Sequence, residues 1–527
     1  MLIHQFLENS ASRTPDKVAL IHGGKRATYS RLDRSANSLA NWLLQCGMQP
    51  GGRVLMLLEN GEEYVISYYA TLKAGMVAVP LSPETRSEAL QQIMMSTTPQ
   101  VVIASAKGEK ALREISPPPA SLIAAVLTDP TSSWQERPFP ALAFGTLVAE
   151  EERAPAPAID PSSLASIIFT SGSTGTPKGV MLSHANIVAN SESIIRSLEL
   201  TGADRQMVVL PFFYVMGSSL LNTHIAVGGS LVINNTFAYP ASVLKQMAEE
   251  EVTGFSGVPS TYAHLLHRSP LKAYRDKLPA LRYCSQAGGH MARQIKEELL
   301  TVLPRHTRLY VMYGATEASA RLSLVPPERL TDKIDSIGVP IPGVTMKIVD
   351  ALGRELPDGE TGELVAAGAN IMSGYWNDAQ STAAVLSPAG YHTGDLGYRD
   401  SEGYFYLLGR RDHQLKVGGH RINPQEIEDA LIASGLLIEV AVLGLEDSLA
   451  GHRLVAVGVP VDGPVTEMQI KERCLKHLPR FKVPSEVLLV AALPKNSNGK
   501  IALSEIREKI ELFRASPATT RPEGTLP

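Results

Sequence analysis

Residues 170–179 read TSGSTGTPKG and combine hydroxyl groups, glycines and one lysine in a single short stretch. Glycines let the backbone approach a polyanion closely, the hydroxyls donate hydrogen bonds, and Lys178 adds a positive charge. The same composition also occurs in flexible linkers. The stretch, however, follows the apolar residues 167–169 and precedes a helical pattern with a candidate N-cap at Ser183. This context favours an ordered loop for a nucleotide triphosphate between a strand and a helix.

Further polar segments supply groups for adenine, ribose and Mg²⁺, which a phosphate loop does not provide. The loop is not a Walker motif, because glycine rather than Ser or Thr follows Lys178, and its glycine spacing is not that of a dinucleotide site. Downstream, Tyr313 and Glu317 offer an aromatic face for adenine and a carboxylate for Mg²⁺. Asp395 on a glycine turn suits the two hydroxyls of a ribose, and Arg410 is placed to reach the same ribose or phosphate. Singly, each residue is typical of an ordinary core, turn or surface position; their joint order indicates nucleotide chemistry.

Five ordered segments, TSGSTGTPKG, YGATE, HTGDLG, GRRDHQLKVGGHRI and NSNGK, resemble the successive signature motifs of the adenylate-forming superfamily. That superfamily contains acyl- and aryl-CoA synthetases, peptide-synthetase adenylation domains and beetle luciferases. The resemblance extends from the TYSRL and GGRVLMLLEN segments near the start to Lys500. It implies an α/β fold, with a large N-terminal domain of stacked α/β sheets and a β-rich subdomain, followed by a small mobile α+β C-terminal domain.

The resemblance implies a role for each matching residue. Thr316, Glu317, Lys416 and Lys500 are implied as catalytic, and Glu317 also as the Mg²⁺ ligand. The residues implied for ATP are Thr170, Ser171, Gly172, Ser173, Thr174, Gly175, Lys178, Gly288, Tyr313, Gly314, Asp395 and Arg410.

Two half-reactions with different needs follow from this resemblance. Attack of a carboxylate on the α-phosphorus of ATP brings two anions together, so it needs cations, which Lys500 and a Mg²⁺ on Glu317 would supply. Asp412 is similar to the family's hinge residue, about which the small domain turns for the second half-reaction. Gly418 and Gly419 would then admit a pantetheine arm, with Lys416 supporting thioester formation. Taken alone, the Gly-Gly pair is equally typical of a hairpin turn.

The segments that match the family's acyl pocket are mostly apolar. No Asp or Glu occurs in residues 206–247, where amino-acid-activating relatives keep an aspartate for the substrate ammonium, so an α-amino acid is disfavoured. A fatty or other apolar acid is expected. Two residues depart from the family pattern: Tyr214 stands where many acyl-CoA synthetases have His, and Val311 where peptide-synthetase relatives have Asn. The implied acid-binding residues are Tyr214, Met216, Gly217, Val258 and Gly289.

The expected activity is ATP-dependent conversion of a carboxylic acid to acyl-AMP and pyrophosphate, followed by thioester formation on coenzyme A. The alternative acceptor is the phosphopantetheine of an acyl or peptidyl carrier protein, which presents the same thiol arm. A luciferase-like oxygenase would share every nucleotide motif. A catalytically inactive nucleotide-binding regulator is disfavoured, because Lys500 and Glu317 are both present.

Length and composition agree with a globular enzyme of several domains. The 527 residues carry a formal net charge of -4, which suggests no nucleic-acid or membrane partner. The three cysteines form no CxxC pair, and no apolar stretch is long enough for a membrane span, so the cytoplasm is the expected location. The oligomeric state is left open. The expected divisions are a large domain over 1–409 with its β-rich part from about 336, a hinge over 410–414, a small domain over 415–514 and a disordered tail over 515–527.

Overall fold

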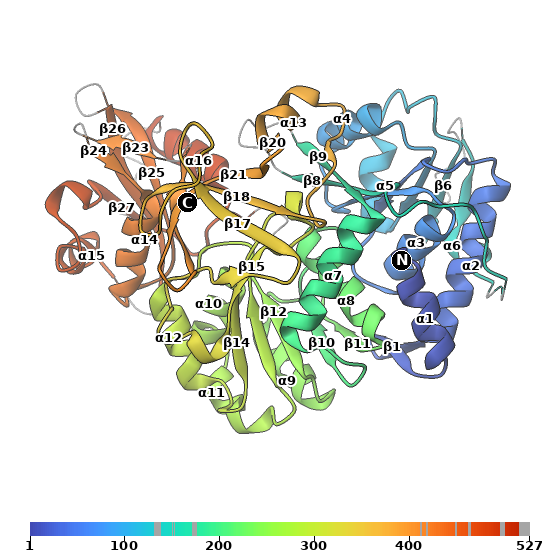
Figure 1. Cartoon of the computed structure of the whole chain (residues 1–527), viewed down its shortest axis with the longest axis horizontal. Helices are drawn as coiled ribbons and strands as arrows, with labels where there is room; N and C mark the ends of the chain where they lie inside the picture. Colours follow the sequence, from blue (N-terminus) through green and yellow to red (C-terminus); the bar gives the residue numbers. More distant parts are fainter. Residues whose placement is uncertain are drawn as a thin grey trace.

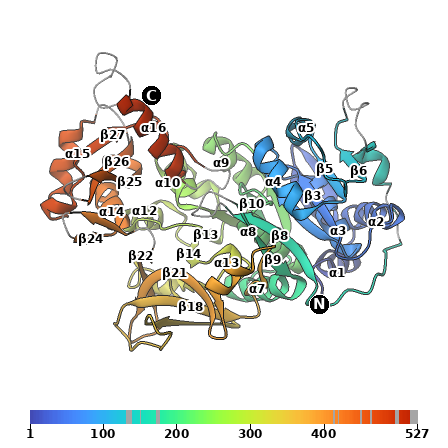
Figure 2. The same cartoon turned by 90° about the horizontal axis from the view of Figure 1, so that it is seen from above.

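The structure is a computed structural model that describes residues 1–130, 139–149, 151, 153–170, 177–411, 414–417, 420–447, 451–461, 465–495 and 501–515. Within these residues the strands form four sheets (Figures 1 and 2). Two large sheets and their helices occupy the N-terminal part of the chain. The last sheet, in orange and red, lies at the opposite side of the molecule from the N-terminus (Figure 1). This arrangement confirms the predicted α/β fold with a large N-terminal and a smaller C-terminal domain.

The first large sheet carries several strands whose ends hold predicted site residues. The strands from β14 to β1 run parallel to their neighbours, so their carboxyl ends meet at one edge of the sheet, where α/β proteins usually bind ligands. In sheet order these strands are β16 (Val339–Pro340), β15 (Ser323–Val325), β14 (Arg308–Tyr313), β13 (Tyr283–Gln286), β12 (Gly254–Gly257), β10 (Arg205–Val208), β11 (Ser230–Ile233), β1 (Val18–His22) and β2 (Lys25–Thr28).

The second large sheet presents the predicted phosphate loop at the end of a hairpin. β8 and β9 are antiparallel partners, with Thr170 opposite Lys178, so the loop connects two strands. The expected direct passage from strand to helix is therefore wrong, although Ser183 does cap α7 through a capping box with Asn186. In sheet order these strands are β19 (Gly374–Tyr375), β9 (Lys178–Ser183), β8 (Leu164–Thr170), β4 (Val77–Leu81), β3 (Arg53–Leu57), β5 (Val101–Ala104), β6 (Ala124–Leu127) and β7 (Ala141–Ala143).

Helices join the two large sheets and cover their outer faces. α1, α2, α3, α7 and α8 contribute to one apolar core that also includes buried residues of both sheets, so the sheets share a helical layer. The helices of the large domain are α1 (Gln5–Arg13), α2 (Tyr29–Gln45), α3 (Glu62–Lys73), α4 (Ser87–Thr97), α5 (Ala106–Arg113), α6 (Phe144–Leu147), α7 (His184–Leu198), α8 (Val215–Val227), α9 (Pro240–Glu249), α10 (Pro259–His267), α11 (Leu271–Tyr274), α12 (Arg293–Val302) and α13 (Ala379–Val385).

Two smaller sheets follow. The third contains β17 (Val344–Val349), β18 (Gly362–Gly368), β20 (Leu386–Ser387), β21 (Gly390–Arg399) and β22 (Phe405–Arg410). The fourth contains β23 (Leu415–Val417), β24 (His420–Ile422), β25 (Leu437–Asp447), β26 (Gly451–Pro460) and β27 (Glu486–Leu489), together with α14 (Pro424–Ala433), α15 (Glu467–Cys474) and α16 (Leu503–Ala515).

The predicted domain divisions fall close to these elements. Arg410, expected at the start of the hinge, is the last residue of β22, because it still pairs with Asp395 across the third sheet. Ala515, expected to begin the tail, ends α16, and residues 516–527 lie outside the described part of the chain. Among the described helices, none has both the length and the apolar character needed to cross a membrane.

Candidate active site

Tyr313 and Asp395 are in contact, although they belong to strands of two different sheets. The Tyr313 hydroxyl donates a hydrogen bond of 2.5 Å to Asp395 Oδ2. On the other side, Arg410 Nη1 lies 3.7 Å from Asp395 Oδ1. Burial, and then the Asp395 carboxylate, raise the pKa of Tyr313 well above its usual range, so the phenol remains a donor at neutral pH. Three residues predicted for adenine and ribose are thus close together, while their binding roles stay predictions.

An irregularity in the pairing of β21 with β18 holds Asp395 in this position, so the residue lies within a strand and not on the predicted glycine turn. Gly394 adopts φ +74°, and its N–H donates to Glu363 Oε1 at 3.2 Å. A side chain at this glycine would begin 3.1 Å from Arg410 Nη2, so glycine keeps the arginine close to the carboxylate. Glu363 was not singled out in the sequence, because its link to the HTGDLG segment depends on the pairing of β18 with β21.

Tyr375 connects two residues that were predicted for phosphate and Mg²⁺. Its hydroxyl donates a hydrogen bond of 2.7 Å to Glu317 Oε1, and Lys178 Nζ lies 5.2 Å from the centre of its ring. Lys178 Nζ also donates to Ser381 Oγ at 2.9 Å. Sequence reasoning missed Tyr375, since the only local signal is an aromatic residue after Gly374 in a short apolar run.

The hairpin that carries the phosphate loop ends beside this tyrosine. β19, which contains Tyr375, pairs with β9 shortly after Lys178. The strand that follows the loop therefore lies close to Glu317, which accepts a hydrogen bond from Tyr375. Thr170 Oγ1 donates to the Lys178 carbonyl oxygen at 3.5 Å across the hairpin. The remaining predicted loop residues, Ser171, Gly172, Ser173, Thr174 and Gly175, lie outside the described residues.

Glu317 is suited to share a metal ion with phosphate groups. One of its carboxylate oxygens is held by Tyr375, whereas Oε2 accepts no hydrogen bond from the residues that the structure describes. In those residues, no group of three His, Cys, Asp or Glu side chains is arranged to hold a metal. Mg²⁺ commonly binds through one or two carboxylates plus substrate phosphates, and this donor set fits that mode rather than an all-protein cage. Thr316 lies beside Glu317 at the start of the same short 3₁₀ turn.

Met216 and Val258, both predicted to contact the acid, belong to one buried apolar cluster between α7, α8 and the first sheet. Tyr214 precedes α8 as its N-cap residue, with its ring 4.6 Å from that of Phe213. The cluster also contains Ile194, Leu198, Leu200, Leu210, Leu220, Tyr283, Ala287, Tyr310 and Met312. These contacts provide an apolar surface of the kind an acyl or aryl group requires.

Gly217 has a packing reason to be glycine. A Cβ at this position would lie 1.9 Å from the carbonyl oxygen of Pro211, which forbids any side chain. Its predicted part in acid binding stays untested.

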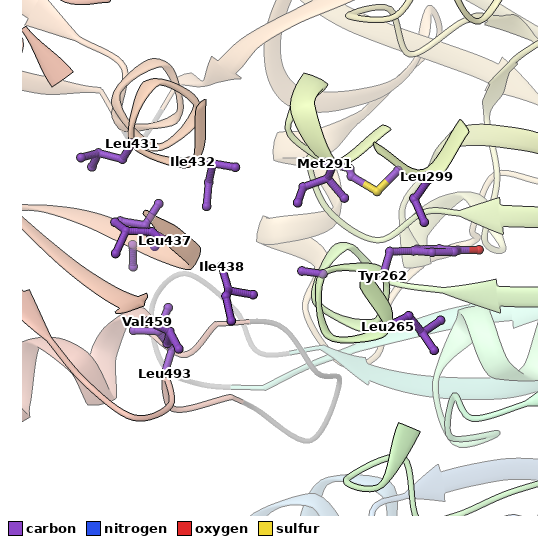
Figure 3. Close-up of a cluster of buried hydrophobic side chains, with 14 of the residues drawn as sticks. Tyr262, Leu265, Met291, Leu299, Leu431, Ile432, Leu437, Ile438, Val459 and Leu493 are labelled. Carbon is purple, nitrogen blue, oxygen red and sulfur yellow. The ribbon is translucent and has the colours of Figure 1, made fainter. Parts of the chain in front are cut away.

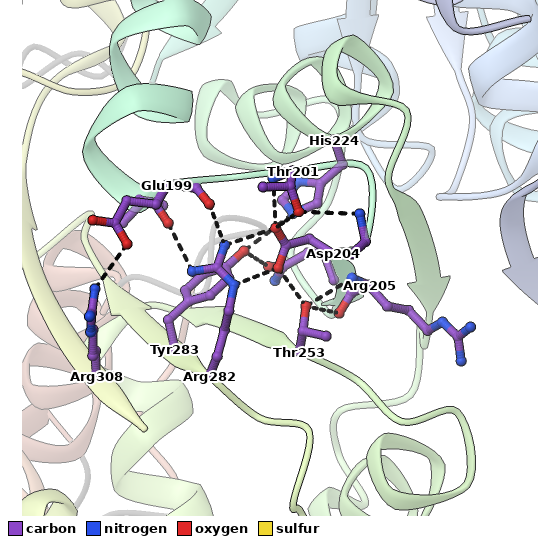
Figure 4. A network of polar contacts seen from close by, with 12 residues as sticks. Glu199, Thr201, Asp204, Arg205, His224, Thr253, Arg282, Tyr283 and Arg308 are labelled. Atoms are coloured by element: carbon purple, nitrogen blue, oxygen red, sulfur yellow. Dashed lines mark hydrogen bonds and ion pairs between the residues drawn. The ribbon is translucent and has the colours of Figure 1, made fainter. Parts of the chain in front are cut away.

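A polar network adjoins the apolar cluster at Tyr283, which belongs to both (Figure 4). The hydroxyl of Tyr283 donates to Gln206 Oε1 at 2.6 Å and lies 3.2 Å from His224 Nε2. Burial lowers the pKa of His224 to about 4, so the imidazole is neutral at pH 7. Beside it, Asp204 accepts 2.6 Å and 2.8 Å hydrogen bonds from Nε and Nη2 of Arg282. The polar side chains of this network therefore hydrogen-bond to one another.

Gly288 and Gly289 line a cavity of about 250 Å³ between the large domain and the C-terminal domain. Apolar residues of the two domains face each other here (Figure 3). Ion pairs join the domains beside it: His290 Nε2 lies 2.9 Å from Asp429 Oδ1, and His264 Nε2 lies 3.7 Å from Glu439 Oε2. The predicted adenine and acid segment is thus next to the domain interface.

Most of the residues predicted for the second half-reaction fall outside the described part of the chain. These are the hinge residue Asp412, the glycines Gly418 and Gly419, and the adenylation lysine Lys500. Lys416 is described and is exposed on β23, where its carbonyl oxygen lies 3.1 Å from His452 Nδ1.

The comparisons with known proteins agree with this geometry. Residues 7–376 match the model of the AMP-binding enzyme family, and residues 426–500 match the model of the AMP-binding enzyme C-terminal domain. A feruloyl-CoA synthase of an Amycolatopsis species is 30% identical over 95% of this chain and 97% of its own. A long-chain-fatty-acid–CoA ligase of Bacillus subtilis is also 30% identical, over 96% and 94% of the two chains.

Among solved structures, ATP-bound MatB from Rhodopseudomonas palustris superposes with a TM-score of 0.85 at 27% identity, over 96% of this chain and 99% of that one. The similarity thus covers both domains and nearly the full length of each protein. The chain belongs to the AMP-binding enzyme family.

Proposed function

We propose that this protein is an acyl-CoA ligase that converts a carboxylic acid and ATP to acyl-AMP and pyrophosphate and then transfers the acyl group to coenzyme A. The observation that carries the proposal is the contact between Tyr313 and Asp395, with Glu317, Tyr375 and Lys178 beside the same strand ends. This set offers an aromatic face, a ribose acceptor and phosphate ligands in one place.

The chemistry of the first step explains why these groups are needed. The carboxylate oxygen and the α-phosphate are both negatively charged, so their approach is opposed by repulsion. Lys178, held between Ser381 and Tyr375, would bind the phosphates, and Lys500, through its resemblance to the family's lysine, would supply a second positive charge. A Mg²⁺ ion on Glu317 would lower the charge of the departing pyrophosphate. Asp395 and Arg410 would fix the nucleotide through its ribose, so that the α-phosphorus faces the acid.

The apolar cluster around Met216 and Val258 supports an acid with an apolar body. Gln206, His224 and Tyr283 contact one another beside this cluster, so Tyr283 donates its hydroxyl proton to Gln206 and not to a polar tail of the acid. Relatives at the same identity are named for an aromatic acid and for fatty acids, so family membership leaves the acid open. We propose a fatty or other apolar acid body of limited length.

We further propose that residues 1–409 act as the adenylating domain and residues 415–514 as a small domain turning about Asp412. The cavity and the polar contacts of His290 with Asp429 and of His264 with Glu439 lie between these domains, and such a rotation would break them. After this rotation, Gly418, Gly419 and Lys416 would face the acyl-AMP in place of Lys500.

Pyrophosphate release, measured across a panel of carboxylic acids with ATP and Mg²⁺, tests the first half-reaction. Acid-dependent release without CoA, followed by thioester formation when CoA is added, is the expected result. Supplying a phosphopantetheinyl carrier protein in place of CoA distinguishes the alternative acceptor. Acid-independent ATP hydrolysis, or none at all with every acid, would contradict the proposal, and oxygen consumption would indicate the luciferase-like alternative.

A further inference from the structure

Arg321 carries a positive charge that lacks a counter-ion among the residues that the structure describes. The residue is 3% exposed, and its Nε donates to no acceptor. The one hydrogen bond of its guanidinium group within those residues runs from Nη1 to the adjacent Ala320 carbonyl at 3.4 Å. Burial lowers the pKa of Arg321 to about 10, so the group is still charged at neutral pH. A buried charge without a partner is strongly unfavourable.

Among the described residues, two other buried cations have carboxylate partners. Lys73 Nζ lies 2.9 Å from Glu8 Oε1, and Lys333 Nζ lies 2.8 Å from Asp400 Oδ2. A third, Lys296, donates to the carbonyl oxygen of Ile334. Arg321 differs from all three because its Nε has no acceptor in this part of the chain.

The position of Arg321 connects it to the candidate active site. A Cβ built on Gly314 would lie 2.7 Å from the Arg321 Cα and 2.0 Å from the Ala320 carbonyl oxygen, so the two segments are in backbone contact. Gly314 follows Tyr313 in the YGATE segment, which the resemblance implies for ATP. Glu317 lies in the turn that joins the two segments.

The backbone around Arg321 is held firmly in spite of strain. Ser319 and Ala320 adopt φ values of +56° and +123°, which residues with side chains disfavour. Asn190 of α7 fixes the next residue, because its Nδ2 donates to the Arg321 carbonyl oxygen at 2.8 Å and its Oδ1 accepts from the Arg321 N–H at 3.3 Å. The same helix contributes Ile194 to the apolar cluster. The backbone of Arg321 is thus held between Gly314 and α7, a helix that also borders the apolar cluster.

We propose that Arg321 pairs with a second anionic group, a carboxylate or sulfonate, on an acid substrate whose body is otherwise apolar. The inference rests on the proposed ligase function and narrows its substrate class. One carboxylate of the acid would react with ATP, while the second group stays ionised against the guanidinium, whose fork of donors matches such a group. The phosphates of ATP are the other anions near this position, and the test separates the two.

The first experiment compares matched acids with the wild-type enzyme. Pyrophosphate release is measured with malonate, succinate, glutarate and adipate against the monoacids of equal chain length, and with phthalate against benzoate. We expect the best diacid to exceed its matched monoacid by about 10²-fold in kcat/KM, since an unpaired buried arginine disfavours the monoacid complex. Wild-type enzyme that uses monoacids and rejects every diacid would overturn the inference and leave the ligase function intact.

The second experiment removes the charge. Arg321→Leu should lose about 10²-fold in kcat/KM for the best diacid, gain or keep activity with the monoacid and leave the KM for ATP unchanged, while Arg321→Lys restores part of the diacid activity. A higher KM for ATP with an unchanged preference between acids would assign Arg321 to the nucleotide and refute the inference.

Melting temperatures provide a readout that does not depend on turnover. Arg321→Leu should melt no lower than the wild type, whereas the control variant Arg282→Leu, which leaves the buried Asp204 without its cationic partner, should melt clearly lower. Saturating diacid should raise the melting temperature of the wild type but not of Arg321→Leu. If no acid is turned over, the ligase proposal fails, and this shift alone then decides the anion site: its absence in the wild type would refute it.

Discussion

Gly314→Ala should disable the enzyme through a backbone clash, although it adds only one methyl group. A Cβ at Gly314 would lie 2.0 Å from the carbonyl oxygen of Ala320, and ordinary contacts begin near 3.4 Å, so the Ala320–Arg321 backbone must retreat by about 1.4 Å. Neither side of this contact is a side chain that can rotate away. Misplacement of a site by about 1 Å can cost 10²-fold in rate, and overpacking typically costs about 1–3 kcal/mol of stability.

The assay is acid-dependent pyrophosphate release, with the melting temperature measured on the same samples. Gly314→Ala should lose about 10²-fold or more in kcat/KM and melt a few degrees lower. Gly145→Ala is a matched control, because a Cβ at that glycine meets no atom within 4 Å. A Gly314→Ala enzyme whose kcat/KM stays within threefold of the wild type would refute the reasoning, as would an equal loss in the control.

Three further predictions concern single side chains. Tyr313→Phe removes the hydroxyl that holds Asp395, so we expect the KM for ATP to rise about 10-fold, in line with a hydrogen bond to a charged group; an unchanged KM would separate Tyr313 from ribose binding. Lys500→Ala should slow acyl-AMP formation about 10²-fold but spare thioester formation from pre-made acyl-AMP. Equal losses in the two assays would exclude the proposed rotation of the small domain between the two half-reactions. Burial raises the pKa of Glu428 from 4.5 to about 7, so the folded protein keeps a proton that the unfolded chain releases, and stability is lost as pH rises from about 4.5 to 7. Glu428→Gln should therefore gain stability relative to the wild type at pH 8, by up to about 3 kcal/mol more than at pH 5; a pH-independent difference in melting temperature would contradict this.

The sequence predicted the parts of the site that depend on local pattern. The YGATE segment was recognised by its pattern, and Tyr313 lies at the end of a strand. Asp395, predicted on a glycine turn, lies within a strand instead and contacts Tyr313. The capping residue Ser183 was also identified correctly, because a hydroxyl before a helical pattern is a local signal.

What the sequence did not predict depends on contacts between distant segments. β9 was not recognised as a strand between the loop and α7, because its few residues show neither clear alternation nor helical spacing. Only its pairing with β8 identifies it as a strand. Tyr375 and Arg321 have ordinary local surroundings. Only the folded chain shows that Tyr375 connects Lys178 with Glu317 and that Arg321 is buried with no counter-ion among the described residues.

The shared position of Tyr375 means that Lys178 and Glu317 are energetically coupled. One ring supports the ammonium group of the first and hydrogen-bonds the carboxylate of the second, so a change at either residue alters the support of the other. The effects of substituting both residues should therefore not add, as is usual for groups with a common neighbour. A displacement of Tyr375 would therefore move the residue predicted for the phosphates and the residue predicted for Mg²⁺ together.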